Sequence, residues 1–186
     1  LGLLMIQALT GASTIDLGEA VLAQINTLRG KGFIPGTMYA DAEPGFGGLV
    51  GKLAGLDIDI AGAGDHLDKI DAKIRRVKEM ARSISGGLPW ELPNSLVRDL
   101  VNNAISLMNL KRNTSTGNVT SARVAFTGRK PNYKKELGLA FGDYCEVYNP
   151  TVEVKDPLTP RTDPCIALWS SGNANGSWVF YNMKTN

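Results

Sequence analysis

The stretch LRGKGFIPGTMYAD, Leu28 to Asp41, decides the fold class, because a helical pattern gives way there to a strand pattern. Upstream, Asp16 caps or opens a predicted helix that runs to Arg29 with apolar residues at helical spacing. Glycines end that helix, and Phe33 to Ala40 reads as a short strand, since proline is tolerated near a strand's beginning. Asp41 falls where the strand stops. Helix, turn and strand in this order predict an α/β fold.

Further elements extend this pattern in both directions. Leu1 to Leu9 reads as a buried strand. Helices are predicted around Phe46 to Leu53, from about Asp65 to Ile84, and from Ser95 to Leu110, with a strand at Leu56 to Ile60. After a linker-like stretch rich in Asn, Thr, Ser and Gly come three strand candidates, with GNANG as a hairpin turn: Asp143 to Tyr148, Cys165 to Trp169 and Ser177 to Tyr181. The order predicts an α/β front portion, a linker and a small β-rich tail.

Composition bounds the class of protein. The 186 residues are 43% hydrophobic, which suits a globular chain, and the net charge of +2 leaves nucleic-acid attraction to local patches. No apolar run approaches the ~20 residues of a membrane span, and the apolar start is too short and lacks the flanks of a signal peptide. The three Asn-X-Ser/Thr matches are therefore read as chance, and an intracellular piece of a longer protein is expected. Cys145 and Cys165 are expected as small buried thiols that pair only if strands bring them together.

The segment LDKIDAKIRRVKE, Leu67 to Glu79, places the carboxylate of Asp71 among five cations. Leu67, Ile70, Ile74 and Val77 fall on one helix face, which is predicted to be apolar. A neighbouring stripe is formed by Asp71, Arg75, Lys78 and Arg82. Such a stripe has two interpretations: a solvated face with ordinary i, i+4 pairs, or a surface for a phosphate backbone.

Several familiar sites are excluded by their spacing. A P-loop needs Gly and Ser or Thr where this chain has Phe46 and Leu53, and the dinucleotide pattern needs Gly or Ala at Val50. His66 is the single histidine, so no histidine pair can hold zinc, and a capping or surface role is expected for it.

What remains is the acid pair Asp41 and Asp71. Asp41 ends a strand and Asp71 lies near the start of a helix, and ligands bind at strand ends in α/β sheets. Two carboxylates meeting there would suit Mg²⁺ or Mn²⁺, hard ions that take oxygen ligands and contact phosphates. Spacing alone supports this weakly, because any α/β domain offers such pairs.

Four passages, in this order, resemble the integrase region of Copia-type LTR retrotransposon polyproteins. They are QINTLRGKGFIPGTMYADAE (24–43), GAGDHLDKIDAKIRRVKEMARSISGGLPWELP (62–93), ARVAFTGRKPNYKKELGLAFGDY (122–144) with TGRKP its most recognisable part, and PRTDPCIALWSSGNANGSWVFYNMKT (160–185). The resemblance implies a ribonuclease H-like mixed sheet with flanking helices, followed by a small β-rich, SH3-like, barrel-like domain. It divides the chain into a catalytic core (1–112), a linker (113–142) and the small domain (143–186).

The resemblance also implies an activity. Integrases of this family process retroelement DNA ends and join them to target DNA with a D, D, E triad that holds Mg²⁺ or Mn²⁺. Asp41 matches the second acid, and Asp71 matches the third, where the family normally has Glu. The cations beyond Asp71 are then expected to lie along DNA: Lys73, Arg75, Lys78 and Arg82. DNA and further copies of the chain are the expected partners, without a membrane, and the parent element would act in nucleus and cytoplasm.

The departures from the family shape the expectation. Leu1 to Leu9 leads directly into the Asp16 helix and so matches the third strand of the fold, and the first acid has no counterpart. This piece is therefore expected not to join DNA by itself. The alternative is a catalytically inactive nucleic-acid-binding or assembly module derived from such an integrase.

Overall fold

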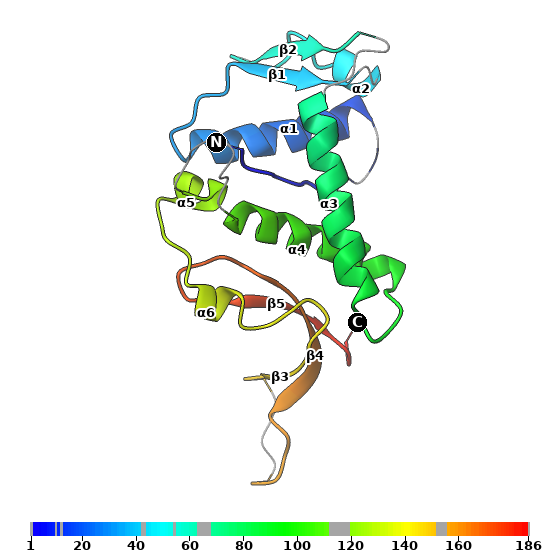
Figure 1. Cartoon of the computed structure of the whole chain (residues 1–186), viewed down its shortest axis with the longest axis vertical. Coiled ribbons are helices and arrows are strands. Elements are labelled where there is room, and N and C mark those ends of the chain that lie inside the picture. The colour runs from blue at the N-terminus through cyan, green and yellow to red at the C-terminus, as the bar shows by residue number, and fades with distance from the viewer. Residues whose placement is uncertain are drawn as a thin grey trace. The chain divides into compact units, whose positions relative to one another are not determined.

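The computed structural model describes residues 2–9, 11, 13–41, 44–53, 55–62, 68–111, 120–151 and 156–185. The chain is mixed α/β, with a two-stranded parallel sheet and a three-stranded antiparallel sheet (Figure 1). It divides into two compact units, Leu1–Arg76 and Val77–Asn186. The boundaries that the resemblance places at 112 and 142 stay predictions. None of the helices in the described ranges is both long enough and apolar enough to span a membrane.

The first unit begins with helix α1, Thr14–Arg29, which confirms the predicted helix with a different cap. Ser13 is the N-cap, and its Oγ accepts a hydrogen bond from the Asp16 backbone N–H at 3.2 Å. The Asp16 carboxylate in turn accepts from the Ser13 backbone N–H at 3.3 Å, which completes a capping box. Asp16 therefore belongs to the first turn of the helix and is not its cap.

The parallel sheet consists of β1, Thr37–Ala40, and β2, Asp57–Ile60, with Thr37 opposite Asp57 and Ala40 opposite Ile60. The predicted strand ending at Ala40 is confirmed in its second half only. Short helix α2, Pro44–Gly47, follows, where a longer helix was predicted. Side chains from helix, strands and loops form one core: Ile25, Ala40, Leu49, Leu56 and Ile58.

The predicted strand at Leu1 to Leu9 is wrong for its described residues, 2–9, which form neither strand nor helix. The physical reason is that a strand needs a partner for its backbone groups, and among the described strands β1 and β2 pair with each other. Ile6 and Leu9 are exposed. The apolar composition of this segment therefore does not mean that these two side chains are buried.

Helix α3, Asp68–Gly86, has 19 residues and passes from the first unit into the second. Its predicted apolar face is wrong at two positions, because Ile70 and Ile74 are 42% and 46% exposed. Farther along, Ala81 and Ile84 pack against the core of the second unit. The apolar spacing therefore corresponds to burial at Ala81 and Ile84, in the later turns of the helix, and not at Ile70 and Ile74.

The second unit continues with the 3-10 turn η1, Asn94–Leu96, and helix α4, Val97–Leu110, which together confirm the predicted helix. The antiparallel sheet has the order β3-β4-β5, close to the three predicted strands: β3 Tyr144–Tyr148, β4 Thr162–Ser170 and β5 Trp178–Asn182. Helix α4 packs on β4, and the core contains Leu96, Leu100, Phe141 and Leu168. Two short helices, α5 (Ala122–Thr127) and α6 (Tyr133–Glu136), lie between α4 and the sheet in sequence.

Candidate functional site

The two predicted metal ligands lie in the first unit. Asp41 directly follows β1 and is exposed, and Asp71 is exposed in the first turn of α3. Within the described ranges, no three or more His, Cys, Asp or Glu side chains gather to hold a metal ion. The pairing of Asp41 with Asp71 around a metal stays a prediction. His66 lies outside the described residues.

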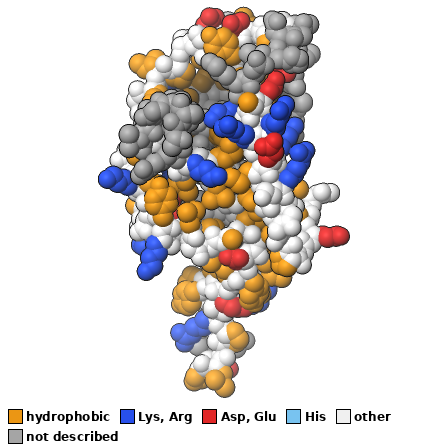
Figure 2. Space-filling view, viewed as in Figure 1, with side chains coloured by type: hydrophobic (Ala, Val, Ile, Leu, Met, Phe, Trp, Pro, Cys, Tyr) orange, Lys and Arg blue, Asp and Glu red, His pale blue; other side chains and the backbone are white. Residues whose placement is uncertain are grey.

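The predicted basic stripe of α3 is solvent-facing. Arg75, Lys78 and Arg82 are exposed, whereas Lys73 is half-buried. Arg76, which the sequence analysis left out, is exposed as well. Figure 2 shows Lys and Arg side chains gathered over the surface where α3 runs in Figure 1. The helix therefore offers four accessible cations within two turns.

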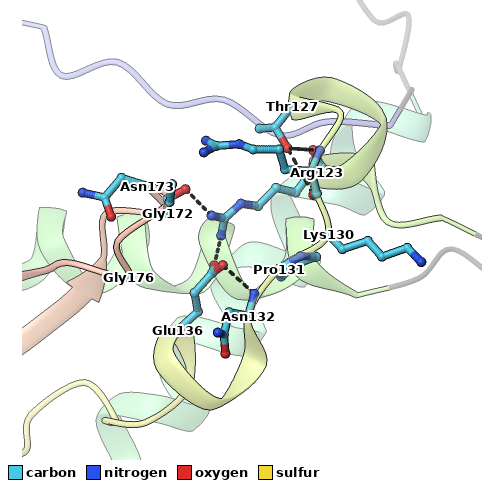
Figure 3. Close-up of a pocket in the computed structure, with 11 residues that line it drawn as sticks. Arg123, Thr127, Lys130, Pro131, Asn132, Glu136, Gly172, Asn173 and Gly176 are labelled. Carbon is cyan, nitrogen blue, oxygen red and sulfur yellow. Dashed lines mark hydrogen bonds and ion pairs between the residues drawn. The ribbon is translucent and has the colours of Figure 1, made fainter.

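A second cationic site, which the sequence analysis did not predict, lies entirely within the second unit. It is a pocket of about 330 Å³ between the α5–α6 segment and the hairpin that joins β4 to β5 (Figure 3). The TGRKP motif supplies four of its residues, and the GNANG turn supplies four more. The lining is completed by Arg123 of α5, by Asn132 at the start of α6 and by Glu136 of α6.

Helix α5 ends at the TGRKP motif. Ser121 caps the helix start, where its Oγ accepts from the Val124 N–H at 3.3 Å. Gly128 ends the helix with φ of 69°, a left-handed conformation that glycine adopts without steric cost, and its N–H donates to the Val124 carbonyl. Thr127 Oγ1 then accepts from the Arg129 N–H at 3.3 Å. This turn places Arg129 and the following Lys130 on the pocket lining.

Helix α6 positions the acid of the pocket. Asn132 is its N-cap, with the side-chain oxygen accepting from the Lys135 N–H at 3.2 Å. One turn later, Glu136 Oε1 accepts from the Asn132 N–H at 3.1 Å. Both bonds hold the first turn of a very short helix together. The bond from the Asn132 N–H also fixes the carboxylate of Glu136, which is 5% exposed.

An ion pair between Arg123 and Glu136 forms the wall of the pocket. The guanidinium group forms an ion pair with Glu136 Oε2, and its Nη2 donates to the Gly172 carbonyl at 2.6 Å (Figure 3). The Arg123 side chain is 15% exposed. Gly172 has φ of 69°, and a Cβ there would collide with the guanidinium group. Glycine at this position therefore lets the hairpin backbone approach Arg123.

The charge that remains in the pocket is positive. Glu136 neutralises Arg123, while Arg129 and Lys130 are exposed and are the other two charged residues of the lining. Three cations against one carboxylate leave two net positive charges. Two hydrogen-bonding side chains of the lining, Asn132 and Asn173, are exposed too. The pocket is thus suited to an anion.

A larger groove of about 770 Å³ lies in the same unit and is bounded on one side by the same ion pair. Its wall is mostly apolar, with Leu88, Trp90, Phe141 and Trp178 among the lining residues. Asn103 is 6% exposed and lines this groove. The Trp178 indole N–H is already used, since it donates to the Lys135 carbonyl at 3.0 Å.

The two cysteines lie directly opposite each other on β3 and β4 and are free thiols. Burial, with the Asp143 carboxylate second, raises the pKa of Cys145. Burial, followed by Asp163, raises the pKa of Cys165. A raised pKa reduces the thiolate fraction, so neither cysteine is an activated nucleophile.

Searches with the sequence find no matching protein-family model and no matching curated protein.

The residues of this pocket had a recognisable signal in the sequence. A Ser at the start of a short helical stretch and a Thr-Gly pair at its end predict a capped helix followed by a turn that carries two cations. GNANG predicts a tight hairpin. The contact between Arg123 and Gly172 joins the helix to the hairpin. These residues are 49 positions apart, and no local sequence pattern predicts their contact.

Proposed function

We propose that this chain is a nucleic-acid-binding part of an integrase-like, metal-dependent DNA-joining enzyme. The proposed fold is a ribonuclease H-like core followed by an SH3-like small β domain. The four passages that resemble Copia-type integrases support the proposal. So does the order of the elements, in which the α/β segment with β1, β2 and α3 precedes an antiparallel three-stranded sheet.

One observation carries the proposal. The exposed Asp71 lies in the first turn of helix α3, and four exposed cations, spaced within two turns, follow it: Arg75, Arg76, Lys78 and Arg82. Exposed cations along one helix favour contact with phosphates. Phosphates occur at every nucleotide, so guanidinium and ammonium groups can contact the nucleic-acid backbone whatever the base sequence.

Asp41 and Asp71 would hold Mg²⁺ or Mn²⁺ in this proposal. Both are exposed carboxylates, the donor type that these ions prefer. A bound ion would neutralise charge on phosphate oxygens during the transfer. Asp71 is one methylene shorter than the Glu of the family, so its oxygens reach less far from α3. Retroelement ends and target DNA would be the nucleic-acid partners, with a homo-oligomer as the assembly.

The departure at Asp71 favours a second candidate function, a catalytically inactive nucleic-acid-binding or assembly module. Calorimetric titration with Mn²⁺ separates the two. If the chain belongs to a metal-dependent enzyme, the wild type should bind Mn²⁺. Asp41→Asn and Asp71→Asn should each abolish this binding. Binding that is unchanged in either variant would remove that carboxylate from the metal site and favour the inactive module.

DNA binding is the direct test of the proposal. The triple variant Arg75→Gln, Lys78→Gln, Arg82→Gln is compared with a control of equal charge loss at exposed positions outside α3: Lys31→Gln, Lys52→Gln, Arg161→Gln. Fluorescence anisotropy of a labelled duplex across a salt series gives the slope of log K against log salt. The α3 variant is expected to reduce that slope by roughly 2.7, about 0.9 for each contact. Equal effects of both variants would show non-specific attraction and contradict the role of α3.

A further inference from the structure

We infer that the pocket behind TGRKP binds a phosphate group of a nucleic-acid strand, as a second contact point besides α3. This inference rests on the proposed function for the identity of the ligand, but its site lies wholly in the second unit and uses other residues. Its grounds are the charge of the pocket, its construction and its size.

The first ground is charge. Arg129 and Lys130 follow each other at the end of α5, both exposed and both on the lining. The side chains of successive residues usually point in different directions. Here the left-handed Gly128 and the hydrogen bond from the Arg129 N–H to Thr127 Oγ1 fix the turn that carries both cations. Because Glu136 neutralises Arg123, the charges of Arg129 and Lys130 stay available to a ligand.

The second ground is the rigid wall. Arg123 is held on two sides, by the Glu136 carboxylate and by the Gly172 carbonyl at 2.6 Å (Figure 3). Glu136 is itself held by the Asn132 N–H. The hairpin is closed by Asn173, whose Oδ1 accepts from the Ser177 N–H at 2.9 Å. A wall fixed by such bonds loses little conformational entropy when a ligand enters.

The third ground is size and polarity. A pocket of about 330 Å³ is at the small end of ligand sites. It accommodates a phosphate with its sugar, whereas the larger apolar groove on the other side of the ion pair does not offer cations beyond Arg123. Arg and Lys are also the side chains that contact phosphates most often in nucleic-acid interfaces.

The experiment titrates the whole chain with three probes: a single-stranded oligonucleotide, inorganic pyrophosphate and a Glu-rich peptide. The local readout is the amide resonances of Gly172, Asn173 and Gly176, which line the pocket. The variant is Arg129→Gln, Lys130→Gln. Its matched control is Lys134→Gln, Arg161→Gln, which removes one Lys and one Arg that are exposed outside the pocket.

The oligonucleotide is expected to shift the three resonances in the wild type and the control but not in the variant. Its affinity should fall about tenfold in the variant, and the salt slope should fall by roughly 1.4, about 0.7 for each contact with a single strand. Pyrophosphate, which is a free source of phosphate groups, should shift the same three resonances, but more weakly than the oligonucleotide does.

The failures of the two proposals are distinguishable. If the α3 variant loses DNA affinity while Arg129→Gln, Lys130→Gln behaves like its control, the pocket inference is overturned and the proposed function stands. If the resonances respond to pyrophosphate alone, or more strongly to the Glu-rich peptide, the strand assignment is overturned. If the pocket resonances respond to the oligonucleotide and the α3 variant binds normally, the pocket inference stands and the role of α3 fails.

Discussion

Arg123, which is partly buried, and the buried Glu136 form an ion pair that joins helix α5 to helix α6 and lines two cavities of the second unit. Each partner has a further contact, Arg123 with the Gly172 carbonyl and Glu136 with the Asn132 N–H. The pair thus connects the TGRKP turn to the β4–β5 hairpin. Positions far apart in the sequence depend on it for their arrangement.

Removal of one partner of this pair should destabilise the second unit strongly. Glu136→Leu leaves the Arg123 charge nearly buried and uncompensated, which typically costs about 3 to 5 kcal/mol. The double variant Arg123→Met, Glu136→Leu removes both charges and should lose much less than the sum of the single variants. Urea unfolding of all four proteins measures the coupling free energy. Additive effects of the two substitutions would show that the pair contributes no coupling.

The capping box of α1 should matter for the first unit. Ser13→Ala removes the acceptor for the Asp16 N–H and should lower the free energy of unfolding by about 1 kcal/mol. Ser83→Ala, an exposed serine inside α3, is the control and should be close to neutral. Thermal unfolding followed by circular dichroism compares them. Equal changes in the two variants would contradict the capping role.

Stability should fall in acid partly through Asp163. Hydrogen bonds from Lys184, then Asn149, and to a lesser degree Asn182, lower the pKa of its carboxyl group. A pKa that is lower in the folded than in the unfolded chain stabilises the fold above the ordinary aspartate pKa of about 4, and this contribution is lost as the pH falls through the folded value. The melting temperature should therefore drop more between pH 6 and pH 3 in the wild type than in Asp163→Asn. Asp57→Asn, at an exposed position of β2, is the control of equal charge loss. Equal drops in the wild type and Asp163→Asn would contradict the role of Asp163.

The cysteines should react slowly at neutral pH. Because burial and then Asp143 raise the pKa of Cys145, its thiolate fraction at pH 7 is below that of a free cysteine. Alkylation by iodoacetamide, followed by mass spectrometry, should still accelerate as the pH rises above the ordinary cysteine pKa of about 8.5. Asp143→Asn removes one of the two causes and should raise the rate at pH 7, whereas Asp156→Asn should leave it unchanged. A rate at pH 7 equal to that of a cysteine peptide would contradict the burial argument.

A single cation of α3 should affect all DNA sequences alike. Arg75→Ala is expected to reduce the salt slope of binding by roughly one unit, with the same loss of affinity on unrelated duplexes. Salt-dependent anisotropy on two duplexes of different sequence measures both quantities. A loss confined to one duplex would indicate contact with bases.

The sequence by itself determined the class and the order of the elements. Spacing and end signals located α1, α3, α4 and the three strands of the antiparallel sheet, because caps, glycines and periodicity act over a few neighbouring residues. It also identified the exposed stripe of α3, since charged side chains stay in water wherever the helix packs.

Only the tertiary structure decided what those elements contact. Residues 2–9 have a strand-like composition but form no strand, and Ile70 and Ile74 have helical spacing but are exposed. The register that places Cys145 opposite Cys165 and the ion pair between Arg123 and Glu136 are long-range contacts. Pairing and burial depend on which surfaces meet in space, and local sequence does not carry that information.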